Sequence, residues 1–186
     1  MKTSIISIVV AVVLSVFSME VHADSLHVQD FSMNLSGWKV HDISGYHRKK
    51  EGSKFEWVGW AQKGENSLSV QMRDPTDKPF EDWVKEAEEQ ALGWYMNYCK
   101  CHSYKITSTK KRSGVLDAPN LTSVTYQVNE YDLKKGSAGR KDRAAVLTLS
   151  VKGTLYYVII YDTNAVSLSD GEGILVAEEV LSSINR

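Results

Sequence analysis

The chain of 186 residues carries 22 Lys and Arg against 23 Asp and Glu, which gives a formal net charge of −1. This even balance argues against a protein that binds nucleic acid or another polyanion in general. With 42% hydrophobic residues, the chain is long enough to bury the core of one ordinary domain.

The N-terminus has the pattern of a secretory signal peptide. Lys2 precedes an uncharged, largely apolar run over residues 5–17, and Val21-His22-Ala23 has the small-x-small form of a cleavage site. The run is too short to favour a membrane span, and no later stretch is apolar enough to form one. We therefore expect residues 1–23 to be a cleaved signal peptide and residues 24–186 to form a single domain. The mature protein is expected to be periplasmic or secreted, with no transmembrane segment.

Strand patterns fill the first part of this domain. We expect two short strands between Leu26 and Val40, a longer strand over Lys54–Gln62, and a half-buried strand in which Leu68, Val70 and Met72 alternate with polar residues. The last two strands should form a hairpin. On the strand over Lys54–Gln62, the expected faces carry Phe55 and Trp57 on one side, and Val58 and Trp60 on the other.

The clearest helical signal runs from Asp77 to Tyr98. Asp77 is a suitable N-cap, and Pro79 suits the first turn because its missing donor costs little there. At roughly 100° per residue one apolar stripe forms, and it consists of Phe80, Trp83, Val84, Ala87, Ala91, Trp94, Tyr95 and Tyr98. The acids expected to face water are Glu81, Asp82, Glu86, Glu88 and Glu89. An aromatic stripe of this kind predicts a helix packed on a sheet.

Strands are also expected after this helix, over residues 104–109, 121–131 and 145–151. We expect Leu133–Arg143 to be an exposed, flexible, basic hairpin loop. The stretch Leu155–Tyr161, LYYVIIY, is apolar on both faces, which is typical of a central strand that is covered on both sides.

A capping-box spacing, Ser169-x-x-Glu172, opens a final helix, on which Ile174, Ala177, Leu181 and Ile184 are in register. Two helices, and a strand that is apolar on both faces, predict one helix on each face of the sheet. Because most connections are short hairpins, the sheet should be mainly antiparallel. The expected fold class is therefore α+β, arranged as an α-β-α sandwich.

This order of elements resembles the PsbP/Mog1-like fold, and most closely its small periplasmic members of the DcrB type. The similarity runs through Ser69–Pro75, the acidic helix, the later hairpins and Ala177–Ile184, and it covers most of the mature chain. It is a likeness of architecture and patterning. The resemblance implies an accessory or binding protein rather than an enzyme, since the fold has no shared catalytic residues, and it names no partner. The segment Cys99–His102 and the lack of a lipid-anchor cysteine at the cleavage site depart from DcrB-type proteins.

Both cysteines lie in the segment Cys99-Lys100-Cys101-His102, at the end of the expected helix. In an oxidising compartment two cysteines normally pair, but two positions apart on a helix their side chains diverge by roughly 160°. One interpretation is a local disulfide that closes the helix end, or two thiols without a role.

Two further interpretations of this segment stay open. Cys99, Cys101 and His102 would suit copper or zinc, with Met96 or a distant histidine as a fourth ligand. Alternatively, the two cysteines form a thiol–disulfide redox site or an intermolecular bridge, although no thioredoxin-like pattern accompanies them.

Basic residues cluster in the expected turns. The clusters are Arg48-Lys49-Lys50, Lys110-Lys111-Arg112, and the loop residues Lys134, Lys135, Arg140, Lys141 and Arg143. Gathered at one end of the sheet, they would form a positive patch for an acidic protein or lipid headgroups; ordinary solubilising charge is the alternative. The tryptophans are expected in the core, and a stacking site would need two of them exposed together.

Familiar catalytic motifs are missing from the sequence. It contains no His-Glu-x-x-His, Gly-x-Ser-x-Gly or Walker loop. His41, Asp42 and His47 do not have a known metal-binding spacing, so exposed histidines are the simpler interpretation. The expected function is a non-enzymatic binding or accessory protein that acts through a protein–protein surface, an immunity or inhibitor protein being one version. A copper- or zinc-binding protein and a redox protein are the alternatives.

Overall fold

The computed structural model describes residues 24–46, 52–73, 75, 77–106, 112–118, 121–135, 140–162, 168–169 and 171–184. The expected signal peptide, residues 1–23, lies outside this part of the chain. The strands are β1 (Asp24–His27), β2 (Ser32–Leu35), β3 (Lys39–Val40), β4 (Glu56–Lys63), β5 (Asn66–Arg73), β6 (Cys101–Ile106), β7 (Arg112–Ala118), β8 (Leu121–Lys135), β9 (Arg140–Val151) and β10 (Thr154–Asp162). The helices are α1 (Phe80–Cys99) and α2 (Glu172–Ser183). Neither of these two helices is long and apolar enough to cross a membrane.

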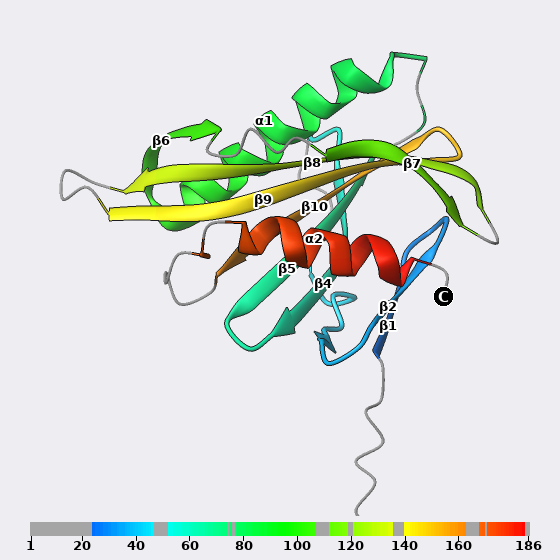
Figure 1. Cartoon of the computed structure of the whole chain (residues 1–186), viewed down its shortest axis with the longest axis horizontal. Helices are drawn as coiled ribbons and strands as arrows, with labels where there is room; N and C mark the ends of the chain where they lie inside the picture. The colour runs from blue at the N-terminus through cyan, green and yellow to red at the C-terminus, as the bar shows by residue number, and fades with distance from the viewer. Residues whose placement is uncertain are drawn as a thin grey trace, which may run out of the picture.

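The fold is α+β, as expected, with a mainly antiparallel sheet. Among the described residues, eight strands form one sheet in the order β3-β4-β5-β10-β9-β8-β6, and β7 also pairs with β8. Strands β1 and β2 form a separate pair. Strand β8 is long enough for β7 to pair with its first half and β6 with its last residues, so the two short strands lie end to end along it (Figure 1).

Strand β10 occupies the centre of the sheet, which confirms the expectation for LYYVIIY. It pairs with β5 on one side and β9 on the other. Every residue from Leu155 to Tyr161 is buried. Its residues alternate between two core clusters: Leu155, Tyr157, Ile159 and Tyr161 belong with the buried residues of α1, and Tyr156, Val158 and Ile160 belong with those of α2.

Helix α1 begins later than its capping signal predicted. Pro79, and not Asp77, precedes the first helical residue, and no side chain caps this end. Its buried residues are Trp83, Val84, Ala87, Ala91, Leu92, Tyr95 and Cys99. The expected stripe is therefore right over the first turns and wrong at its end, because Trp94 and Tyr98 are exposed and Leu92 takes a buried place.

Two of the acids expected in water lie instead against neighbouring strands. Glu86 forms ion pairs with Arg73 of β5 and with Lys54. Glu88 accepts hydrogen bonds from the side-chain amides of Gln127 and Asn129 on β8. Burial, and then the neighbouring Glu88 carboxylate, raise the pKa of the Tyr131 hydroxyl. These contacts attach α1 to the sheet through polar groups as well as through its apolar face.

The expected flexible loop over Leu133–Arg143 is wrong in its described parts. Strand β8 continues to Lys135 and β9 begins at Arg140, with Leu133 opposite Asp142 in the ladder. Leu133 and Asp142 are both buried. We expected a loop because this stretch of the sequence is rich in charged residues. In the structure some of these charged residues have partners inside the protein and alternate with apolar residues, which is the pattern of a strand pair.

Helix α2 begins at Glu172, and Gly171 with φ 81° precedes it. Half of the expected capping box forms, since the Glu172 carboxylate accepts a hydrogen bond from the backbone N–H of Ser169 at 2.8 Å. Ile174, Ala177, Leu181 and Ile184 are buried as expected, and Ile184 bridges to Met33 of β2.

Candidate functional site

The cysteines form a disulfide at the junction of α1 and β6. Cys99 is the last residue of α1, and Cys101 is the first of β6. Between them Lys100 adopts a left-handed conformation with φ 55° and donates its N–H to the carbonyl of Met96. The Cα atoms of the two cysteines are 5.3 Å apart, inside the usual range for a disulfide. The helical argument against pairing does not apply, because the helix ends before the second cysteine.

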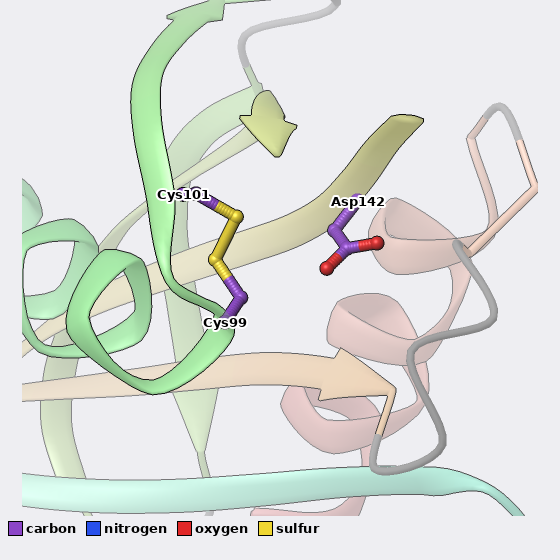
Figure 2. Close-up of side chains that lie close together, drawn as sticks. All are labelled: Cys99, Cys101 and Asp142. Atoms are coloured by element: carbon purple, nitrogen blue, oxygen red, sulfur yellow. A yellow bond between two sulfur atoms is a disulfide. The ribbon is translucent and has the colours of Figure 1, made fainter. Parts of the chain in front are cut away.

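A buried carboxylate completes a compact cluster with this disulfide. Asp142 of β9 is 2% exposed, and its carboxylate oxygen and the two Sγ atoms all lie within 4.8 Å of one another. Figure 2 shows Asp142 directed from its strand toward the bridge between α1 and β6. We name Cys99, Cys101 and Asp142 the Cys/Asp cluster.

Sequence reasoning missed Asp142 and proposed His102 in its place. His102 is exposed, and within the described part of the chain it belongs to no cluster of potential metal ligands. The sequence signal for the burial of Asp142 was its spacing of two and four residues from Ala144 and Val146, which places all three on the same face of a strand. Both Ala144 and Val146 are buried in the core cluster of α1. The assumed loop over residues 133–143 concealed this alternation.

The chemistry of the cluster depends on its oxidation state. As a disulfide, the two sulfurs carry no thiolate, and the bridge simply ties the end of α1 to the start of β6. Cys99 is 6% exposed and Cys101 9% exposed, so the bridge is shielded from solvent. Reduction would place two thiols beside a buried carboxylate. These three groups form a set of metal ligands, and the two thiols form a redox couple with the disulfide.

Of the residues expected in the basic patch, the structure describes the side chains of two, Lys134 and Arg143. Lys134 is exposed. Arg143 instead points to an internal partner, since its Nε lies 2.8 Å from Asp132 and 3.7 Å from Glu130, and Glu130 is fully buried. The described part of the chain does not include Arg48, Lys49, Lys50, Lys110 and Lys111, and it does not include the side chains of Lys135, Arg140 and Lys141.

Exposed aromatic rings gather beside the Cys/Asp cluster, near the end of α1. Trp94 is 38% exposed and Tyr98 53% exposed. The two rings stack with their planes 8° apart and their centroids 5.7 Å apart, and both meet the ring of Tyr161 on β10 edge to face. Burial raises the pKa of the Tyr161 hydroxyl above its usual value.

A second set of rings lies on and beside β4. The ring centroids of Trp57 and Trp60 lie 6.3 Å apart, His41 stacks on Trp60 at 4.0 Å, and Tyr46 meets Trp57 edge to face. The sequence predicted Trp57 and Trp60 on opposite faces. A bulge between Trp57 and Gly59 shifts the alternation by one residue and brings both tryptophans to the same face.

Ser67 of β5 connects the two sets of rings. The indole N–H of Trp60 donates to the Ser67 hydroxyl oxygen at 2.8 Å, and Tyr161 lies directly opposite Ser67 in the ladder between β10 and β5. The rings therefore form a continuous series across β4, β5, β10 and α1. We name this series the aromatic belt, and it consists of His41, Tyr46, Trp57, Trp60, Trp94, Tyr98 and Tyr161. His41 is thus held by an aromatic ring, and among the described residues it joins no group of potential metal ligands.

The comparisons with known proteins add no relative. No model of a known protein family matches the chain, and no curated protein is similar enough in sequence to count as a relative.

Proposed function

We propose that this protein is a secreted or periplasmic, non-enzymatic binding protein, and that the aromatic belt is its surface for a protein partner. The observation that carries the proposal is a pair of neighbouring sets of exposed and half-buried rings, one from Tyr46 to Trp60 and the other of Trp94 and Tyr98, which the buried Tyr161 joins. An inhibitor or immunity protein for a secreted toxin is one version of this function.

The composition and the rigidity of the belt both support a protein partner. Tryptophan and tyrosine are enriched in the central residues of protein interfaces, where they bury a large area at a small entropic cost. The belt rings are already held in place, since the indole N–H of Trp57 donates to the Gly59 carbonyl at 2.9 Å and that of Trp60 to Ser67. The stacking of Trp94 on Tyr98 uses one face of each ring, which reduces the planar area left for a sugar.

For the fold we propose the α-β-α sandwich of the PsbP/Mog1-like kind. Its support is the alternation of β10 residues between a cluster with α1 and a cluster with α2, because successive side chains of a strand point to opposite faces. Such a fold places accessory and binding surfaces on a scaffold without requiring a catalytic site.

The proposed location rests on the N-terminal sequence and on the cysteines. Residues 1–23 have the signal-peptide pattern. A disulfide between Cys99 and Cys101 suits an oxidising compartment such as the periplasm or the cell exterior. Fusing the first 23 residues to a reporter that folds only after export tests the location directly.

Site-specific photo-crosslinking in the producing cells tests the binding surface. A photoreactive phenylalanine analogue replaces Tyr98 in one variant and Leu175 in the control, since Leu175 is 65% exposed on α2 and outside the belt. We expect a discrete adduct from position 98 that disappears when Trp94→Ala and Trp57→Ala are added. Equal adducts from both positions, or none from position 98, would reject the belt as the interface, and an adduct with glycan would indicate a sugar ligand.

A further inference from the structure

We propose that the Cys/Asp cluster binds zinc when its disulfide is reduced, so that disulfide formation and zinc binding exclude each other. The inference goes beyond the proposed binding function and does not depend on it. It concerns Cys99, Cys101 and Asp142, whose ligand atoms come from α1, β6 and β9.

The distances suit a tetrahedral ion. With a Zn–S bond of about 2.3 Å and a Zn–O bond of about 2.1 Å, tetrahedral ligand atoms lie about 3.6–3.8 Å apart. In the oxidised cluster the three ligand atoms already lie within 4.8 Å of one another. Reduction frees the two sulfurs to separate to that spacing, while the sulfur–carboxylate distances need to change by no more than about 1.2 Å. A water molecule would complete the fourth position.

The placement of the ligands also favours a defined site. Cys99 ends a helix and Cys101 begins a strand, so neither backbone position is free to drift. Asp142 lies within the β8–β9 ladder, with Leu133 as its partner. Because the three ligands lie on fixed elements, they lose little conformational entropy when they bind an ion.

Charge favours a cation in the site once the thiols have lost their protons. Two thiolates and a carboxylate carry three negative charges among buried residues. A divalent cation offsets two of these charges. Zinc accepts both sulfur and carboxylate ligands, whereas copper(I) prefers sulfur and imidazole ligands. Because the third ligand is the Asp142 carboxylate and not the His102 imidazole, the cluster favours zinc over copper.

The chemistry balances with a dithiol as reductant. The Cys99–Cys101 disulfide accepts two electrons and two protons and becomes two thiols, while the dithiol becomes a disulfide. Zn²⁺ then displaces the two thiol protons and binds two thiolates and the Asp142 carboxylate. In the reverse direction a disulfide oxidant accepts two electrons and becomes two thiolates, while the two cysteine thiolates form the Cys99–Cys101 disulfide, which removes two ligands and releases the ion.

Cobalt(II), a spectroscopic substitute for zinc, provides the test. The purified protein is reduced with a dithiol, freed of reductant without oxygen, and titrated. We expect thiolate-to-cobalt absorption that saturates at one ion per chain and that excess zinc abolishes, with no such absorption from the oxidised protein. Asp142→Asn should weaken binding by about tenfold or more, while His102→Ala should leave the affinity unchanged.

Two further measurements keep the result decisive if Asp142→Asn does not fold. Asp142→Cys should raise the absorption by about half, because three thiolates replace two. X-ray absorption of the zinc complex of the unaltered protein should show two sulfur ligands without the outer scattering of an imidazole. A disulfide that stays oxidised in the folded protein, absorption unchanged in Asp142→Cys, or an imidazole in the zinc spectrum would each overturn the proposal.

Discussion

Arg143 shows how a surface-type residue can serve the interior. Its guanidinium neutralises Asp132 and lies close to the fully buried Glu130, so its loss removes a positive charge from beside two buried carboxylates. We expect Arg143→Met to lower the free energy of unfolding by about 3 kcal/mol, as breaking one side of a buried ion pair generally does. Urea denaturation measures the change, and Lys134→Met, at an exposed position of the same hairpin, should alter it little.

Glu86 gives a prediction about pH. Its partial burial acts to raise its pKa, but the hydrogen bonds and charges of Arg73 and Lys54 outweigh this and hold the pKa below its usual value. A depressed pKa contributes stability that is present above the unfolded value of about 4.3 and is lost as the pH falls through the folded value. Because Glu86 is partly solvated, Glu86→Gln should cost only about 0.5 kcal/mol at pH 7.

Denaturation of this variant at several pH values tests the sign. The difference between wild type and Glu86→Gln should shrink as the pH falls below about 4. Glu81→Gln, on the exposed side of α1, should show no comparable change. A difference that grows in acid would contradict the stabilising role assigned to the Glu86 carboxylate.

At the scale of elements, two helical glycines should respond in opposite ways to alanine. A Cβ at Gly173, in the first turn of α2, would lie 2.7 Å from the Cβ of Ala145 on β9. Gly93 on α1 has open space around that position. We expect Gly173→Ala to destabilise the protein by about 1–3 kcal/mol and Gly93→Ala to stabilise it by about 0.5–1 kcal/mol.

Thermal denaturation of the two alanine variants checks this pair. Similar melting temperatures for the two would mean that α2 can move away from β9 without cost. The contrast therefore measures how tightly α2 is seated on the sheet.

The junction between α1 and β6 should depend only modestly on its disulfide. The bridge joins residues two apart, and such a short loop restricts the unfolded chain by only about 1.5 kcal/mol. We expect Cys99→Ser with Cys101→Ser to lose about that much stability, and the reduced, metal-free wild type to match it in urea. A loss above about 3 kcal/mol would show that the native contacts of the sulfurs matter more than the loop.

At the scale of the whole molecule, the position of β10 predicts the order of local opening. β10 has paired neighbours on both sides and is buried from Leu155 to Tyr161, whereas β6 lies at the end of the strand order. Backbone amides of β10 should exchange with solvent only through global unfolding, and those of β6 through local opening. Hydrogen exchange followed by mass spectrometry tests this, and faster exchange in β10 than in β6 would contradict it.

Patterns within single elements carried the successful predictions. The double-sided apolar run of Leu155–Tyr161 predicted a central strand, and the spacing of Ile174, Ala177 and Leu181 predicted the buried side of α2. These predictions succeed because the period of a strand or helix decides which of its side chains face the core, and this period can be read from a short stretch of sequence. The α+β class followed from the order of such elements.

The errors arose where one residue changed the local geometry. A bulge after Trp57 moved Trp60 to the same face. Such irregularities depend on the surrounding packing. A sequence pattern with a period of 2 or 3.6 residues carries no information about that packing. The aromatic belt was therefore hidden in a correct list of residues, whereas the local disulfide of Cys99 and Cys101 was one of the interpretations that the sequence offered.

By itself the sequence determined most of the elements, the buried sides of β10 and α2, the α+β class and the position of both cysteines where α1 ends. Only the tertiary structure decided that Asp142 lies beside those cysteines, that Arg143 faces inward, and that Ser67 lies between Trp60 and Tyr161. The physical reason is that these neighbours belong to separate strands and helices. Their distances depend on sheet order and register, which cross-strand packing sets and no single stretch of the chain specifies.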